Sequence, residues 1–205
     1  MYLFHKNDSF QSTVDGVTVT AFVNAVGLTI HEKNHESEKT KGTKAQRDWL
    51  LQNVAPVVYE RHSTLRKHAS IVAGCTEILR FIYQTEIIDY DWYPQNPLER
   101  CRLDSFFQWH SLHKDAQGLL SSQQHIEAVE SIFLHRINPF IGDFATCSIA
   151  DVVAFGAIMP VWSEYLKKQE SMDRFPKLAR WAAKVSEHEE IVNAVAELKL
   201  PVAKM

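Results

Sequence analysis

The sequence predicts an α/β region at the N-terminus followed by a region built only of helices. Two observations carry this prediction. Short strand patterns alternate with helical patterns over residues 1–84, whereas only helical patterns occur from Asn96 onward. Residues that break helices are also scarce, since Gly and Pro together make up about 7% of the chain, against a usual share near 12%. At 205 residues, the chain has room for one large domain or two small ones.

Seven elements in the order β-α-β-α-β-β-α are expected before residue 85, and they span residues 2–5, 14–26, 28–31, 43–53, 54–59, 70–73 and 76–83. The second element is rich in β-branched residues, but its length and the Gly27 that follows it indicate a helix with a C-terminal cap. Pro56 interrupts the fifth element, a strand.

Helical patterns with distinct signals fill the second region. Residues 123–136 form an amphipathic helix, whose apolar stripe consists of Ile126, Val129, Ile132 and Phe133. Ser148–Asp151 is a capping box, and the apolar residues that follow it indicate a buried central helix. Pro176 fits the first turn of another helix.

Composition excludes several classes of function. The chain carries 22 basic and 25 acidic side chains, so nucleic acid is not expected as a partner. The longest apolar run, Val152–Trp162, is about half of a membrane crossing, and no membrane partner is expected. The three cysteines form no C-x-x-C pair, which favours reduced thiols and a cytoplasmic location. Ten histidines show no ligand spacing, so no metal is expected.

Three segments together resemble the cytosolic glutathione S-transferases. Residues 92–110 (WYPQNPLERCRLDSFFQWH) are similar to the start of the helical domain in theta-class members, Ser148–Asp151 to the family's capping box, and Phe175–Trp181 (FPKLARW) to a later helix. The resemblance implies a thioredoxin-like, glutathione-binding domain over 1–84, a linker over 85–95 and an all-helical domain over 96–205. It also implies glutathione as co-substrate, a small-molecule electrophile and a homodimer.

The glutathione site that the resemblance implies involves two short segments of the first domain. Ala55 and Pro56 fit the family's turn that presents backbone groups to the cysteinyl part of glutathione. The last helix of the domain usually opens with Glu-Ser, but here Gly74 and Cys75 occupy those positions. The carboxylate that would meet the γ-glutamyl ammonium is therefore absent, while the backbone N–H groups can still bind a carboxylate.

Activation of the glutathione thiol in theta-like enzymes uses a serine after the first strand. Ser12 is the favoured residue, with Ser9 and Thr13 behind it, because the loop is longer than in the family. The alternative is that Ser12 or Thr13 simply caps the first helix. Cys75, at a helix start, is expected to have a lowered pKa, and a redox role like that of the cysteine-bearing classes is a further alternative.

Residues after the linker complete the expected site. Asp104 falls where theta-like proteins carry an acid that reaches glutathione across the dimer interface, and an exposed helix carboxylate is the alternative. The expected electrophile pocket comprises Phe106, Trp109, His110 and His113. Trp109 and His113 share a helix face, and core packing is the alternative for the aromatic residues.

Two main hypotheses of function follow. In the first, the chain is an enzyme that adds the glutathione thiolate to small electrophiles in detoxification. In the second, it is a non-catalytic protein-interaction module, like the similar domains of translation factors and synthetase complexes, and Gly74 and Cys75 mark a decayed glutathione site. Storage of apolar ligands between the domains is a third alternative.

Overall fold

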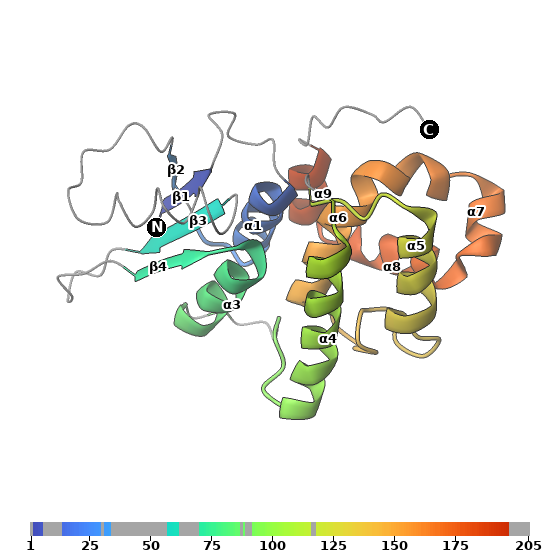
Figure 1. The fold of residues 1–205 in the computed structure, drawn as a ribbon, viewed down its shortest axis with the longest axis horizontal. Helices are drawn as coiled ribbons and strands as arrows, with labels where there is room; N and C mark the ends of the chain where they lie inside the picture. The colour runs from blue at the N-terminus through green and yellow to red at the C-terminus, as the bar shows by residue number, and fades with distance from the viewer. Residues whose placement is uncertain are drawn as a thin grey trace.

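The computed structural model describes residues 2–5, 14–29, 31–33, 57–61, 70–86, 88, 92–115 and 118–196. Within them a small sheet with two helices leads into a larger group of helices (Figure 1). The structure therefore confirms the predicted fold class, an α/β region followed by an all-helical one. The expected helix over 43–53 lies outside the described residues.

The sheet contains strands β1 (Tyr2–His5), β2 (His31–Lys33), β3 (Val57–Arg61) and β4 (Ser70–Ala73), in the order β2-β1-β3-β4. β1 and β2 run parallel, with Tyr2 opposite His31, and α1 (Val14–Ala25) lies between them in the sequence. The pairs β1–β3 and β3–β4 are antiparallel. A parallel β-α-β unit extended by an antiparallel pair is the thioredoxin-like arrangement.

The strand expected over 28–31 begins three residues later than predicted. The N–H of Leu28 donates to the carbonyl of Val23 (3.0 Å), and the N–H of Gly27 donates to the carbonyl of Asn24 (3.0 Å). Gly27 has a φ of 69°, so this is a Schellman end of α1. Leu28 therefore belongs to the helix end and cannot start the strand.

Within the described residues, seven further helical segments follow the sheet. They are α3 (Cys75–Thr85), α4 (Pro97–His113), α5 (Gln123–Ala128) with the π-helical turn η2 (Val129–Phe133), α6 (Ile149–Leu166), α7 (Gln169–Arg174), α8 (Pro176–Val185) and α9 (Glu189–Ala196). The expected helix over 76–83 is confirmed within α3, and Pro176 takes the first turn of α8 as predicted. α3 ends at Thr85 and α4 begins at Pro97, and the expected linker over 85–95 falls between these two helices; its bounds stay a prediction.

The apolar stripe expected over 123–136 is wrong at one residue. Ile126, Val129 and Phe133 are buried, but Ile132 is 59% exposed. The cause is η2, because a π-helical turn holds more residues than an α-helical turn and rotates Ile132 away from the buried face.

Helix α6 is the buried centre of the molecule. By length and composition it is apolar enough to cross a membrane, but 67% of it is buried inside the protein, as expected of a core helix. α1 packs closely against it: a Cβ placed on Gly156 would lie 2.4 Å from the hydroxyl oxygen of Thr18. Through this close approach, α1 of the α/β region packs directly on α6 of the helical region.

The capping box at the start of α6 is confirmed. The carboxylate of Asp151, fully buried, accepts hydrogen bonds from the N–H and hydroxyl of Ser148, the N–H of Ile141 and the indole N–H of Trp181, at 2.7–2.9 Å. Burial raises the pKa of Asp151 to about 6, although each of the donated hydrogen bonds lowers it. One carboxylate thus connects three segments of the helical region.

Candidate functional site

A cleft of about 680 Å³ opens where the two regions meet. Its walls are the first turn of α1, the junction of β4 and α3, and one side of α4. The lining residues are Asp15, Ala73, Gly74, Cys75, Thr76, Glu77, Arg80, Asp104, Phe107, Gln108, His110, Ser111 and Lys114. Charged side chains therefore come from both regions, and the cleft has the size of a site for a small polar molecule.

The start of α3 forms one wall of this cleft. Gly74 is the N-cap residue with a φ of 95°, and no side chain caps the helix. The thiol of Cys75 is buried, and burial raises its pKa well above the ordinary value, with Asp15 contributing further. The expectation of a lowered pKa at this helix start is therefore wrong, because burial and the nearby Asp15 outweigh the lowering effect of Lys114.

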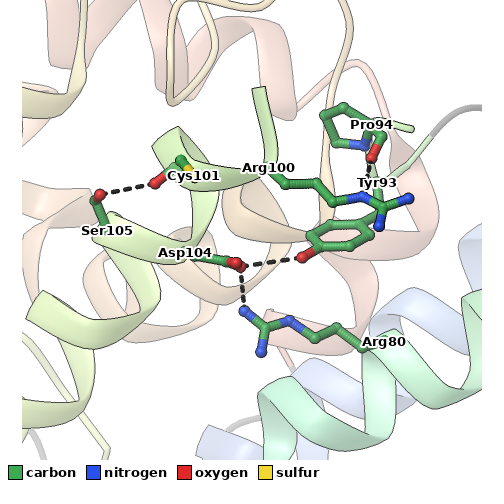
Figure 2. Close-up of polar contacts among 7 residues, drawn as sticks. All are labelled: Arg80, Tyr93, Pro94, Arg100, Cys101, Asp104 and Ser105. Atoms are coloured by element: carbon green, nitrogen blue, oxygen red, sulfur yellow. Dashed lines mark hydrogen bonds and ion pairs between the residues drawn. The ribbon is translucent and has the colours of Figure 1, made fainter. Parts of the chain in front are cut away.

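On the opposite wall, Asp104 is paired within the chain. Figure 2 shows its carboxylate between the guanidinium of Arg80, with which it forms an ion pair, and the hydroxyl of Tyr93, which donates to it at 3.0 Å. The Arg80 guanidinium also lies over the ring of Phe107, 4.9 Å from its centroid. Asp104 thus lines the cleft, and its contacts join α3 to α4, while its expected role across a dimer interface stays a prediction.

A second ion pair crosses the cleft. Lys114, just past the end of α4, places its Nζ 3.2 Å from a carboxylate oxygen of Asp15 in the first turn of α1. The Asp15 side chain is only 7% exposed. A buried carboxylate requires such a partner, so the pair holds the start of α1 against the helical region.

His110 lies at the cleft with one ring nitrogen unpaired. The residue is 4% exposed, and its Nε2 is buried without a hydrogen-bond partner. Burial, together with the nearby Lys114, lowers its pKa to about 3, while a hydrogen bond to the backbone of Gly118 opposes that shift. The ring is therefore neutral near pH 7.

Only one of the four expected electrophile-pocket residues lines the cleft. His110 does, but Phe106 is fully buried in the core. Trp109 and His113 stack on each other, with ring centroids 4.9 Å apart, and Trp109 packs on Phe133. Trp109 and His113 share a face of α4 as predicted, but this face is not the one that lines the cleft. The four residues of the expected pocket therefore lie on different faces of α4.

Of the remaining expected site residues, the structure describes only two. Gly74 and Cys75 lie at the start of α3 as expected. The candidates for thiol activation and for the proline turn, Ser9, Ser12, Thr13, Ala55 and Pro56, lie outside the described residues.

The structure also brings in residues that sequence reasoning did not single out: Asp15, Glu77, Arg80 and Lys114. The acidic Asp15, directly after a helix start, was the one local signal. The others are ordinary charged residues of helices, which only the tertiary arrangement identifies. Among the described residues, no cluster of His, Cys, Asp or Glu could hold a metal ion.

The fold is that of the glutathione S-transferases. A glutathione S-transferase of class Gtt2 from Vibrio parahaemolyticus superimposes with a TM-score of 0.65 at 14% identity, covering 98% of this chain and 100% of that one. Human glutathione transferase theta-2, solved with glutathione, gives 0.57 at 18% identity, covering 98% and 92%. The glutathione transferase URE2P6 from Phanerochaete chrysosporium, solved with oxidized glutathione, gives 0.62 at 17%, covering 96% and 94%.

Comparison of the sequence alone adds nothing to this likeness. No protein-family model matches the chain, and no curated protein matches it. At these identities the solved structures show the shared fold.

Proposed function

We propose that this chain is a theta-like member of the glutathione S-transferase family that conjugates the glutathione thiolate to small electrophiles. The observation that carries the proposal is the cleft between the two regions, which charged side chains line and of which the start of α3 is one wall, in a chain of this fold. Solved proteins of the same fold hold glutathione or its oxidized form.

In the proposed reaction, the thiol of glutathione loses its proton to solvent. Ser12 donates a hydrogen bond to the resulting thiolate, and Ala55 and Pro56 hold the backbone of the tripeptide. The sulfur then forms a bond to the electrophilic carbon, and the leaving group departs with its electron pair. Phe107 and His110, on the α4 wall, border the space for the electrophile.

Retention on immobilised glutathione, followed by a conjugation assay with a chlorodinitrobenzene, tests the proposal. The wild-type chain should be retained and released by free glutathione, and Ser12→Ala should lower turnover while leaving retention unchanged. Ser9→Ala tests the second candidate hydroxyl: turnover should stay unchanged, and a fall in turnover would move the role from Ser12 to Ser9. Absence of both retention and turnover, with several electrophiles, would overturn the proposal.

A non-catalytic interaction module is the second candidate, and two observations favour it. Gly74 carries no carboxylate, and the buried Cys75 thiol is a poor partner for a ligand. If the site has decayed, the chain is not retained on glutathione and instead captures protein partners. Homodimer formation and a cytoplasmic location remain part of both candidates as predictions.

A further inference from the structure

The turn that follows α4 docks on the first turn of α1 through an ion pair. The Nζ of Lys114 lies 3.3 Å from Oδ1 and 3.2 Å from Oδ2 of Asp15, so it contacts both carboxylate oxygens. The Asp15 side chain is 7% exposed, and both residues line the cleft. A nearly buried carboxylate at the edge of the cleft thus receives its cation from the other region of the molecule.

The backbone beyond Lys114 is shaped to allow this contact. Gly118 has a φ of 89°, and a Cβ placed on it would lie 3.1 Å from the Cβ of Val14 and 3.5 Å from Oδ1 of Asp15. The N–H of Gly118 donates to the carbonyl of Asp115, the residue after Lys114, at 3.0 Å. The turn therefore lies directly against the start of α1, and a side chain at position 118 would crowd that contact.

The carboxylate of Asp15 has opposite effects on α1 and on the reaction proposed for the cleft. An acidic residue in the first turn stabilises a helix, because its charge faces the positive end of the helix dipole. The same charge disfavours a second anion nearby and raises the pKa of a thiol that must ionise there. Ser12, the residue proposed to donate to the glutathione thiolate, precedes Asp15 by three positions in the sequence. The charge of Asp15 therefore works against the thiolate unless a cation neutralises it.

Lys114 is the cation that meets this requirement. The other titratable side chains that line the cleft are those of Cys75, Glu77 and Arg80 on α3 and of Asp104 and His110 on α4. α6 and α9 also pack against α1, but none of their side chains lines the cleft. Arg80 is paired with Asp104, and His110 is neutral near pH 7 because burial lowers its pKa to about 3. Among the described lining residues, this leaves Lys114 as the positive charge for Asp15.

We infer that Lys114, through its ion pair with Asp15, prevents the charge of that carboxylate from opposing the glutathione thiolate. The inference rests on the proposed function, in which the thiolate forms beside the start of α1. It makes Lys114 a positioning residue of the reaction, since it acts through Asp15. A contact between the two regions thereby contributes to the chemistry as well as to the fold.

The pKa of the bound glutathione thiol tests the inference. It is measured on the full chain as the pH dependence of thiolate absorbance. The signal is the difference between protein saturated with glutathione and protein saturated with S-methylglutathione, which removes the contribution of the protein's own cysteines. Lys114→Met leaves Asp15 unpaired and should raise this pKa by about one pH unit, the effect of a unit charge within about 10 Å at an effective dielectric constant near 20.

Two further variants distinguish a charge effect from damage to the fold. Asp15→Asn removes the carboxylate and leaves the lysine, so the thiol pKa should lie below the wild-type value. Asp15→Asn combined with Lys114→Met should return the pKa to the wild-type value. Because this double variant buries no unpaired charge, it tests the inference even where Lys114→Met is unstable.

Two control variants complete the series. Lys114→Arg keeps the positive charge beside Asp15 and should give the wild-type thiol pKa. Lys167→Met removes a lysine from an exposed ion pair with Glu164 and should also leave the thiol pKa unchanged.

Shifts of the same sign in the two single variants, or no shift in either, would show that the pair only holds the fold together. Either result would overturn the inference and leave the proposed function standing. A wild-type chain that binds no glutathione at millimolar concentration, or that leaves the thiol pKa at its value in free glutathione, would overturn the proposed function itself.

Discussion

The starts of α3 and α6 differ in how the backbone N–H groups of the first helical turn are capped. At α6, Ser148 and Asp151 form a complete capping box, and both residues are buried. At α3, Gly74 offers no side chain, and the helix opens onto the cleft. The first-turn N–H groups have side-chain acceptors at α6, whereas no side chain among the described residues caps α3.

Under the proposed function, we expect this difference to separate a helix start that stabilises the fold from one that contacts the ligand. Asp151 receives hydrogen bonds from three segments and so contributes to stability. Glu77 occupies a comparable place in the first turn of α3 yet bonds to no described group. Substitutions at α6 should therefore change the stability of the protein, whereas those at α3 should change what it binds.

The largest expected effect is at Asp151. Asp151→Ala leaves the buried N–H groups of Ile141 and Trp181 without an acceptor. The free energy of unfolding should fall by about 4 kcal/mol, as measured by urea denaturation. A fall below about 1 kcal/mol would mean that these donors find other partners.

The ion pair across the cleft comes next. Lys114→Met leaves the carboxylate of Asp15 unpaired at 7% exposure, and the free energy of unfolding should fall by about 2–3 kcal/mol. Lys167→Met, at an exposed position of similar chemistry, is the control and should leave the urea midpoint unchanged. Equal effects of the two variants would show that the buried Asp15–Lys114 pair stabilises the protein no more than an exposed ion pair does.

His110 should make the protein sensitive to acid. The folded protein keeps this ring neutral until about pH 3, whereas the unfolded chain binds a proton near pH 6.5. Stability should therefore fall as the pH drops below 6.5, by up to about 1.4 kcal/mol per pH unit from this group. His110→Gln should show a shallower loss between pH 6.5 and 5, because other titrating groups, Asp151 included, are common to both proteins. Identical slopes would contradict the buried, neutral state of His110.

The smallest effects compare the two helix starts directly. Ser148→Ala removes the N-cap of α6 and should cost about 1 kcal/mol of stability. Glu77→Ala should change the thermal midpoint by less than the error of measurement, because its carboxylate bonds to no described group. A larger loss for Glu77→Ala than for Ser148→Ala would show that Glu77 caps α3.

Local signals in the sequence predicted most of the fold. The end of α1 at Gly27, the capping box at Ser148 and the Pro176 start of α8 each depend on a few neighbouring residues. The predicted burial of Ile132 was wrong because a π-helical turn changes the number of residues per helical turn, and nothing in the apolar pattern indicates such a turn.

The site was harder to predict because it depends on contacts between distant segments. Lys114 pairs with Asp15 across 99 positions of sequence, and no pattern in either segment indicates the contact. Helical spacing placed Trp109 and His113 on one face, but it could not say which face borders the cleft. Gly74 was seen as a loss, and only the geometry shows that the carboxylate of Glu77 lies in its place.

The central claim is that the start of α3 receives the ligand, and backbone amide NMR tests it most directly. On titration with glutathione, the amide signals of Cys75 and Thr76 should show the largest shifts, because their N–H groups take up a hydrogen bond to the ligand. The amide of Ile149, which donates to the backbone of Trp92 at the start of α6, should stay fixed. Unmoved Cys75 and Thr76 signals at saturating glutathione would contradict the claim.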